Sequence, residues 1–362
     1  MTLPAFTHHP SKTPRSQDVR QNILSNPGFG AYFTDHMAAS EWTCERGWFD
    51  ARICPYGPIS LDPAAGVLHY AQEIFEGIKV YRHADGGLWT FRPEANARRF
   101  DRSAQRLALP QLSPGMFTQS LRELVTADAA WVPSGAETSL YCRPFMIASE
   151  PFLGVRAARA VSYYVIASPA GAYFATGLKP AAIWVSTTYA RASKGGTGAA
   201  KCGGNYAASL LPQRLAQEHG CSQVLFLDAV HGKYIEELGG MNLFVVYRDH
   251  RIVTPALSGT ILEGITRDSI ITLARAQGYT VEEQQIPLDT LCAELQSGDV
   301  TELFACGTAA VITPIGCLKG ENFSIGSTDV RVGEVTTALR QSLTDIQYGR
   351  AKDPYQWMVR LV

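Results

Sequence analysis

Apolar and polar residues follow two different periods along this chain, and together they predict a mixture of strands and helices. Apolar runs of strand length occur at 48–60, 139–149, 160–168, 182–188, 223–227, 241–247 and 302–305. Apolar residues at helical spacing predict helices over 93–109, 116–130, 205–219, 265–276 and 335–344. The stretch from Leu68 to Tyr81 also indicates strand, and Asp85-Gly86-Gly87 predicts a hairpin that returns through 88–91. Both halves combine strands with helices, so we expect an α+β or α/β fold.

A stretch of small residues divides the chain near its middle. Residues 168–172, Ser-Pro-Ala-Gly-Ala, interrupt the regular pattern and are typical of a linker. A chain of 362 residues is long enough for two domains at roughly 150 residues each. About the first 25 residues have no regular pattern, and we expect a loosely held arm there.

Composition and charge narrow the classes of function. Hydrophobic residues make up 46% of the chain and charged residues 18%, which is ordinary for a globular protein with a substantial core. The formal net charge of -1 gives no electrostatic argument for binding nucleic acid or an anionic membrane. The cysteines form no CxxC pair and no histidine pair has zinc-binding spacing, so we expect no metal site. The N-terminus lacks the apolar core of a signal peptide, and no run approaches about 18 apolar residues, so we expect a cytoplasmic protein.

One lysine stands in a segment made almost entirely of glycine and alanine. Lys201 lies within 195–204, and a predicted helix begins directly after this segment. Small residues let a ligand approach the backbone closely, so the lysine suits either a nucleotide phosphate loop or a Schiff base. The phosphate loop requires G-x-x-x-x-G-K-[ST], but Ala200 precedes the lysine and Cys202 follows it. A surface loop with an incidental lysine is the alternative that composition alone leaves open.

Three further segments could surround such a lysine. Glu236 and Glu237 end a predicted strand, and because neighbouring strand residues point to opposite faces we expect one in a buried site and the other in solvent. A hairpin edge with two surface charges is the structural alternative. Gly264-Ile265 opens a predicted helix, whose N-terminus offers backbone N–H groups to an anion. The segment 306–310, Cys-Gly-Thr-Ala-Ala, follows a strand and forms a second anion-sized niche.

These segments resemble those of the branched-chain-amino-acid aminotransferases, class IV and fold-type IV enzymes that use pyridoxal 5'-phosphate (PLP). The matching segments run in family order at 33–37, 75–79, 91–110, 141–144, 201–206, 237–244, 264–267 and 307–309. The lysine segment and the Glu-x-Gly-x-x-Asn segment are specific, whereas Gly-Thr-Ala alone is weak.

The resemblance implies a fold, an assembly and a reaction. The expected parts are an N-terminal arm at 1–30, a small α/β domain at 31–168, an interdomain loop at 169–181 and a large PLP-binding domain at 182–362. A homodimer is expected, with active-site residues borrowed from the other subunit. The expected reaction is reversible transfer of the amino group of L-leucine, L-isoleucine or L-valine to 2-oxoglutarate, giving a branched-chain 2-oxo acid and L-glutamate.

The family pattern implies the cofactor-binding residues position by position. Lys201 would form the Schiff base with PLP and later move a proton between the substrate α-carbon and the cofactor. Glu237 would keep the pyridine nitrogen protonated, and Tyr206 would donate to the phenolate oxygen O3′. The remaining contacts are a bidentate fork from Arg99 to the phosphate, backbone N–H groups of Ile265 and Thr266, the hydroxyl of Thr308, and Leu262 against the ring.

The same pattern implies an apolar substrate pocket. The aromatic side chains expected to line it and to suit Leu, Ile or Val are Tyr70, Phe75, Tyr141 and Tyr173. Arg143 would meet the second carboxylate of 2-oxoglutarate and offset the cost of bringing a charge into that pocket. Backbone N–H groups near Gly240 and Ala309 would meet the α-carboxylate.

Three positions depart from the family pattern. Glu263 stands where much of the family has proline, and a carboxylate there would repel a bound phosphate unless it turns outward. Gly240 stands where some members have threonine, so that hydroxyl is absent. Ala310 and Thr313 stand where some animal members have a thiol pair, so no redox switch is expected.

Other functions stay open from the sequence. A D-amino-acid transaminase or an aminodeoxychorismate lyase would share the cofactor and fold, although the aromatic residues and Arg143 argue against both. A nucleotide-binding protein would use the Lys201 loop for phosphate. A non-catalytic PLP carrier would hold the cofactor without turnover.

Overall fold

The computed structural model describes residues 5–171 and 178–362, and the chain forms two compact units. Unit 1 comprises Met1–Ala175, Ala200–Gly203 and Ile346–Val362, and unit 2 comprises Thr176–Ala199 and Gly204–Asp345. The two units therefore interleave along the chain, and the short segment that carries Lys201 packs with unit 1. The linear domain boundaries expected from the sequence stay a prediction.

Unit 1 is built on a largely antiparallel sheet. Its strands are β1 (Thr7–His8), β2 (His36–Thr43), β3 (Gly47–Pro55), β4 (Glu73–Phe75), β5 (Ile78–Arg82), β6 (Leu88–Phe91), β7 (Ser139–Ala148), β8 (Ala160–Ala170) and β19 (Met358–Arg360). They form a nine-stranded sheet in the order β1-β3-β2-β8-β7-β5-β6-β19, with β4 paired to β7. Of the described pairings only β1 with β3 is parallel.

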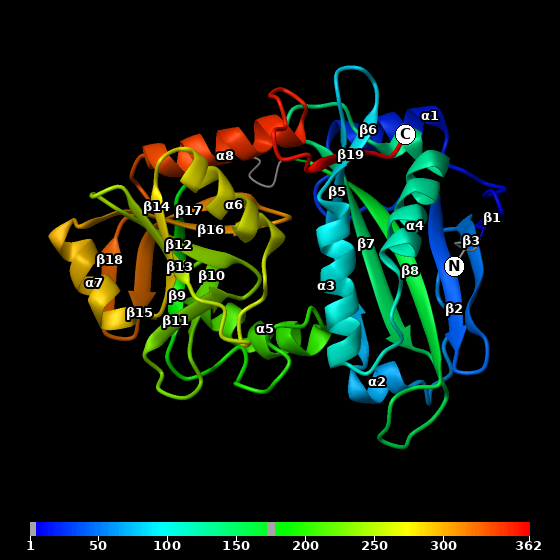
Figure 1. The fold of residues 1–362 in the computed structure, drawn as a ribbon, viewed down its shortest axis with the longest axis horizontal. Coiled ribbons are helices and arrows are strands. Elements are labelled where there is room, and N and C mark those ends of the chain that lie inside the picture. The colour runs from blue at the N-terminus through cyan, green and yellow to red at the C-terminus, as the bar shows by residue number, and fades with distance from the viewer. Residues whose placement is uncertain (1–4, 172–177) are drawn as a thin grey trace. The chain divides into compact units, whose positions relative to one another are not determined.

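Helices of unit 1 cover this sheet and close its core. They are α1 (Gln17–Ser25), α2 (Gly66–Tyr70), α3 (Pro93–Arg106), α4 (Pro114–Ala127) and the 3-10 turn η1 (Ala129–Trp131). Helix α3 contacts α4 and β4, and α4 contacts β2, β3 and β8; Figure 1 shows these helices on the sheet. Helix α4 begins with Ser113, whose Oγ accepts from Met116 N at 3.2 Å. It buries Phe117 and Leu121 completely, and each such side chain contributes about 1.5–3 kcal/mol to folding.

Unit 2 contains a closed barrel. Its strands are β9 (Ala181–Ser186), β10 (Gln223–Leu227), β11 (Tyr234–Leu238), β12 (Asn242–Tyr247), β13 (Arg251–Pro255), β14 (Thr280–Gln284), β15 (Ile286–Pro287), β16 (Val300–Gly307), β17 (Val311–Gly320) and β18 (Phe323–Gly326). The path runs β14-β13-β12-β16-β17-β9-β10-β11-β15, and β12 also pairs with β11, so the six strands from β12 to β11 close on themselves. Its helices are α5 (Gly203–Glu218), α6 (Ile265–Ala276), α7 (Leu288–Ser297) and α8 (Glu334–Gln347), whose last residues belong to unit 1.

The sequence pattern located the long elements and failed on short ones. β10 and α6 have the predicted bounds, and α3, α4, α5 and α8 begin or end within four residues of theirs. The strand predicted from Leu68 is wrong at its start, because α2 continues to Tyr70 and β4 begins at Glu73. A run this short cannot distinguish one helical turn from a strand. The N-terminal arm also contains regular structure, since β1 pairs with β3 and Ser16 caps α1.

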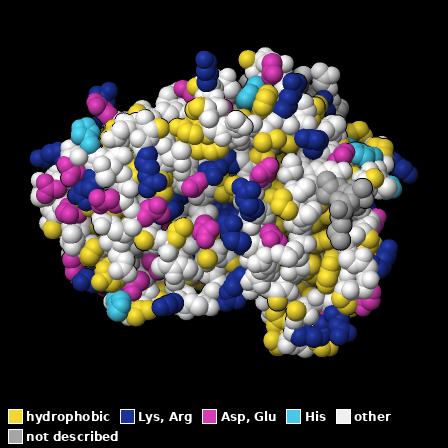
Figure 2. Space-filling model, viewed as in Figure 1, with side chains coloured by type: hydrophobic (Ala, Val, Ile, Leu, Met, Phe, Trp, Pro, Cys, Tyr) yellow, Lys and Arg dark blue, Asp and Glu magenta, His cyan; other side chains and the backbone are white. Residues whose placement is uncertain are grey.

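The distribution of charged side chains on the surface agrees with the formal net charge of -1. On the face drawn in Figure 2, basic and acidic side chains are interspersed over unit 2 and form no broad patch of one sign. Within the described residues, no helix combines the length and apolar character needed to cross a membrane.

Candidate functional site

Lys201 is fixed at its backbone by two elements of unit 1. Its N–H donates to Ser103 Oγ on α3 at 2.9 Å, and its carbonyl accepts from Phe75 N at the end of β4 at 2.9 Å. The neighbouring Ala200 and Cys202 are buried in the unit 1 core. The Lys201 Nζ lies 4.7 Å from the centre of the Phe75 ring. This lysine therefore belongs to a built environment, which argues against the surface-loop alternative.

A buried acid–base pair lies in the turn between β4 and β5. Glu76 is 0% exposed, and Arg99 on α3 donates from Nε to its Oε1 at 2.7 Å and from Nη2 to its Oε2 at 2.8 Å. Asn96 Nδ2 and the Gly77 N–H also donate to Oε2, at 2.8 and 3.1 Å. Burial raises the pKa of Glu76, but the charge and hydrogen bonds of Arg99, with the charge of Lys201, outweigh burial and hold that pKa below its ordinary value. The bidentate fork that Arg99 makes is directed at this carboxylate.

Three of the predicted substrate residues lie together on β4 and β7. The Arg143 Cζ lies 4.7 Å from the Phe75 ring centre and 5.3 Å from that of Tyr141, and its Nη2 donates to the Tyr141 hydroxyl at 2.9 Å. A Cβ on Gly77 would overlap that hydroxyl, so the glycine is required for the position of Tyr141. Arg143 Nε is buried and has no hydrogen-bond partner in the described part of the chain, which an anionic ligand would correct.

Two predicted aromatic residues are not part of this group. Tyr70 ends α2 and is 41% exposed, and its hydroxyl donates to the Leu153 carbonyl. Tyr173 lies outside the described residues.

Unit 2 holds the predicted ring carboxylate in a hydrogen-bond network. Glu237 on β11 is 3% exposed and forms an ion pair with Arg191, which is 7% exposed. Leu262 N donates to Glu237 Oε1 at 2.8 Å, and Asn242 Nδ2 donates to Oε2 at 3.3 Å. Asn242 also donates to the Leu262 carbonyl at 3.1 Å, and Arg191 to the Gly198 carbonyl at 2.9 Å. One carboxylate thus ties together a barrel strand, the Leu262 loop and the glycine-rich segment.

The expectation that Glu236 faces solvent is wrong. Glu236 is 6% exposed, and the Thr260 hydroxyl donates to its Oε1. Burial raises the pKa of Glu236 above its ordinary value, against the hydrogen bond from Thr260. The two glutamates do point to opposite sides of β11, but the loop that carries Thr260 covers the side on which Glu236 lies.

The two segments predicted to bind the phosphate both lie in unit 2. Ile265 and Thr266 form the first turn of α6 and are 9% and 6% exposed. The residue before them, Gly264, provides no side-chain cap for this turn. Thr308 and Ala309 directly follow β16 and are half-buried.

The remaining predicted positions lie on the same unit. Tyr206 is in the first turns of α5, and a Cβ on Gly240 would lie 3.7 Å from its ring. Glu263 is exposed, in agreement with an outward-facing carboxylate.

Sequence reasoning missed the partners that hold these side chains. Asn242 ends the Glu-x-Gly-x-x-Asn segment and Glu76 lies in the segment 75–79, so both stood inside segments already identified. Arg191 carried no such signal, because its carboxylate partner lies 46 residues along the chain.

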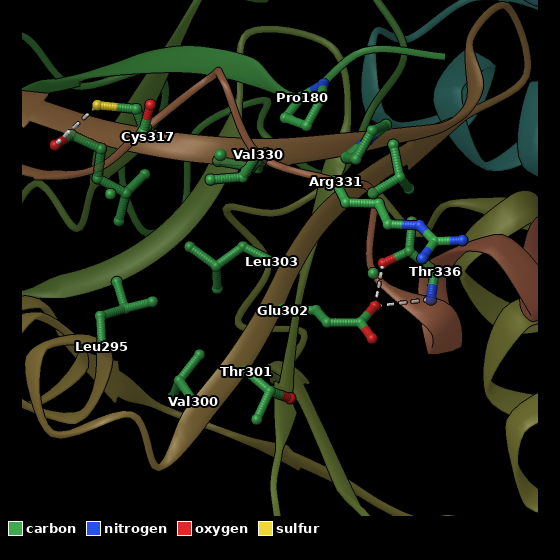
Figure 3. A pocket seen from close by; sticks show the side chains of 18 of the residues that line it. Pro180, Leu295, Val300, Thr301, Glu302, Leu303, Cys317, Val330, Arg331 and Thr336 are labelled. Carbon is green, nitrogen blue, oxygen red and sulfur yellow. Dashed lines mark hydrogen bonds between the residues drawn. The ribbon is translucent and has the colours of Figure 1, made fainter.

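A cavity of about 240 Å³ lies in unit 2. Figure 3 shows apolar side chains such as Leu295 and Leu303 on its wall and a hydrogen-bonded pair, Glu302 and Thr336, at one side. Glu302 accepts from Val335 N at 2.9 Å, from Thr336 N at 2.8 Å and from the Thr336 hydroxyl at 2.6 Å. This carboxylate caps the first turn of α8, and none of the residues that line the cavity is a predicted site residue.

Comparisons with known proteins identify the family. Residues 73–316 match the family model for amino-transferase class IV. The chain belongs to the class IV aminotransferases. It is 54% identical over 360 residues to the branched-chain-amino-acid aminotransferase of Mycolicibacterium smegmatis, and the match covers 98% of each chain.

Solved structures of class IV aminotransferases share this fold. The Escherichia coli branched-chain amino acid aminotransferase superposes with a TM-score of 0.73 at 28% identity, covering 90% of this chain and 100% of that one. The branched-chain amino acid aminotransferase of Thermobaculum terrenum, solved in its PLP form, has a TM-score of 0.71 at 25% identity, covering 89% and 98%. The predictions of a fold-type IV aminotransferase that depends on PLP are confirmed, and the nucleotide-binding alternative is wrong.

The residues of this class IV aminotransferase fit PLP. Lys201 would supply an amine for the aldehyde, and Glu237 would supply a buried carboxylate for the ring nitrogen. The first turn of α6 has no side-chain cap, which leaves backbone N–H groups to an anion such as a phosphate.

Proposed function

We propose that this aminotransferase transfers the amino group of L-leucine, L-isoleucine or L-valine to 2-oxoglutarate and back. The observation that carries the proposal is the group of Phe75, Tyr141 and Arg143, which lies next to the Lys201 Nζ. Its aromatic wall suits a branched aliphatic side chain, and its guanidinium, whose Nε is buried, suits the second carboxylate of 2-oxoglutarate. The 54% identical relative from Mycolicibacterium smegmatis is a branched-chain-amino-acid aminotransferase, which supports the same substrate class.

Lys201 performs the proton transfer in this scheme. When bound, PLP supplies an aldehyde that takes up the amino group and a protonated ring that accepts electrons. Lys201 Nζ would hold the cofactor through its aldehyde and would move the proton at the substrate α-carbon. Ser103 and Phe75 hydrogen-bond the N–H and the carbonyl of this residue, so its backbone is held in place while its side-chain amine moves.

Glu237 keeps the ring nitrogen protonated. Arg191, Asn242 and the Leu262 N–H orient its carboxylate, which would accept the ring N–H. Tyr206 donates to the phenolate oxygen O3′, and Leu262 packs against the ring face.

The phosphate is bound by donors from several elements. Ile265 and Thr266 present backbone N–H groups at the start of α6, and Thr308 presents a hydroxyl. Arg99 uses Nε and one hydrogen of Nη2 for Glu76. The proposal adds the phosphate as a further acceptor for this guanidinium, which has five N–H donors.

Further residues complete the substrate pocket in this proposal. Backbone N–H groups near Gly240 and Ala309 meet the α-carboxylate, and Tyr70 and Tyr173 close the pocket. The enzyme acts as a homodimer, and sedimentation of the holoenzyme at twice the chain mass is the expected result.

Reduction with borohydride tests the position of the cofactor. We expect the holoenzyme to lose its visible band on reduction and peptide mapping to find the label on Lys201. Lys201→Ala should abolish both the band and turnover. Lys194→Ala changes an exposed lysine of the same segment and should leave both unchanged. A label on another lysine would contradict the assignment.

A substrate panel with chiral detection of the product tests the reaction. L-Leucine, L-isoleucine and L-valine should each support turnover with 2-oxoglutarate, and D-alanine should not. Arg143→Leu should raise the KM for 2-oxoglutarate at least tenfold more than the KM for L-leucine, because only the former has a second carboxylate. Turnover of D-alanine without turnover of L-leucine would refute the proposal.

A further inference from the structure

The proposed function gives no part to Glu76, although this carboxylate is completely buried next to the residues that carry the reaction. An ionised carboxylate persists in such a place only when it is paired and hydrogen-bonded. Here Arg99 binds both of its oxygens, and Asn96 and the Gly77 N–H bind Oε2 as well.

The arrangement links the lysine and the arginine through one short turn. Asn96 and Arg99 are three residues apart on α3, so they lie on the same face of that helix and both reach Glu76. The preceding residue, Phe75, binds the Lys201 carbonyl through its backbone N–H. A shift of this turn would therefore move both the Arg99 guanidinium and the anchor of Lys201.

We propose that Glu76 is a positioning residue, which orients the Arg99 guanidinium toward the cofactor phosphate and sets the charge around the Lys201 nitrogen. This inference rests on the proposed function, because it needs a cofactor held by both residues. The charged and polar groups that act on the Glu76 carboxyl are Arg99 and Asn96 from α3, Gly77 from the same turn and Lys201 from the segment 200–203.

Glu76→Gln separates this function from simple packing, since it keeps the size of the side chain and removes its charge. Arg99 would then lose the carboxylate that holds its Nε and Nη2, and its guanidinium would be oriented less firmly toward the phosphate. We expect PLP to bind about tenfold more weakly. A nearby anion favours a protonated nitrogen and a nearby cation opposes it, so the pH midpoint of the visible cofactor band should fall by about one unit.

Three variants make the test. Apoenzyme is titrated with PLP to give a dissociation constant, and the visible band of the holoenzyme is followed against pH. Glu76→Asp keeps the charge, so its midpoint should stay at the wild-type value even if PLP binds more weakly. Asp128→Asn is the matched control, because Asp128 is also a buried unit 1 carboxylate, bound to His36 N at 2.9 Å and to His36 Nδ1 at 2.7 Å. It should lower the melting temperature without moving the midpoint.

The outcomes separate this inference from the proposed function. If the wild-type protein forms no band and carries no label on Lys201, the proposed function fails. The inference is wrong if the wild type behaves as expected but Glu76→Gln binds PLP with the wild-type affinity and keeps the wild-type midpoint. It is also wrong if Asp128→Asn shifts the midpoint as much as Glu76→Gln does. If Glu76→Gln does not fold, Glu76→Asp decides: weaker PLP binding with an unchanged midpoint supports the inference, and wild-type binding overturns it.

Discussion

Removal of the Arg191 guanidinium should destabilise unit 2 far more than removal of an exposed arginine. Arg191 and Glu237 are 7% and 3% exposed, so their ion pair is shielded from water. In Arg191→Met an apolar side chain of similar length would replace the guanidinium. The Glu237 carboxylate would keep its hydrogen bonds from Leu262 N and Asn242 but lose its cationic partner.

The size of the effect follows from burial. Removing one partner of a buried ion pair costs about 3–5 kcal/mol, whereas exposed pairs contribute about 0–1 kcal/mol. For a unit of this size, each kcal/mol lowers the melting temperature by about 2–4 °C, so we expect a fall of about 6–20 °C. A loss this large is a considerable fraction of the roughly 5–15 kcal/mol that stabilises a typical domain.

Denaturant unfolding of the apoenzyme, followed by circular dichroism, measures this effect. Arg251→Met is the matched control, because Arg251 lies in the same unit and pairs with Asp249 and Glu282 but its side chain is 31% exposed. It should cost less than about 1 kcal/mol. Adding Glu237→Gln to Arg191→Met should recover at least half of the loss, since the uncompensated charge disappears. Equal effects of the two methionine variants, or strictly additive effects of the double variant, would refute the reasoning.

Two further predictions concern backbone packing and a loop carboxylate. Gly264→Ala should lower the free energy of unfolding by about 1–3 kcal/mol, because its Cβ would overlap Asn242 Oδ1. Gly204→Ala is the control, because a Cβ there has nothing within 4 Å and should be neutral or slightly stabilising. Equal losses in denaturant unfolding would contradict this. For Asp228, burial raises the pKa, but hydrogen bonds from four backbone N–H groups outweigh burial and hold it below the ordinary value of 3.8. The stability advantage of the wild type over Asp228→Asn should therefore be full well above pH 3.8 and vanish as the pH falls below it, and an advantage that stays constant in melts from pH 7 down to pH 2 would exclude this cause.

The sequence predicted those parts of the fold that local periodicity controls. α6 has the predicted bounds because Gly264 precedes a regular amphipathic run that ends at Ala276. The closure of the barrel by the pairing of Glu237 on β11 with Asn242 on β12 left no local trace, and neither did the pairing of β9 with β17. Such contacts depend on how distant strands meet, which a pattern along one strand does not encode.

The candidate site likewise contains residues that the sequence could predict and residues that it could not. Glu237 could be found from its segment, because a carboxylate at a strand end before Gly239-Gly240 is distinctive. The prediction that Glu236 faces solvent was wrong, because the Thr260 loop covers it. Alternation along a strand predicts the direction of each side chain but does not predict which other segment covers it. Arg191 and the fork from Arg99 to Glu76 could not be found, because their partners lie 46 and 23 residues away in sequence.

The glycines around Lys201 have a second physical explanation that composition does not provide. Small residues near a lysine indicate that a ligand approaches the backbone, yet here the protein itself approaches it. A Cβ on Gly203 would overlap the Glu73 carboxylate, which accepts from the Gly203 N–H, and a Cβ on Gly198 would overlap the Thr260 carbonyl. Gly203 belongs to unit 1 and Gly198 to unit 2, each packed against a neighbour of its own unit. The segment is therefore held tightly on both sides of Lys201, which leaves the amine at the end of its side chain as the part that can move.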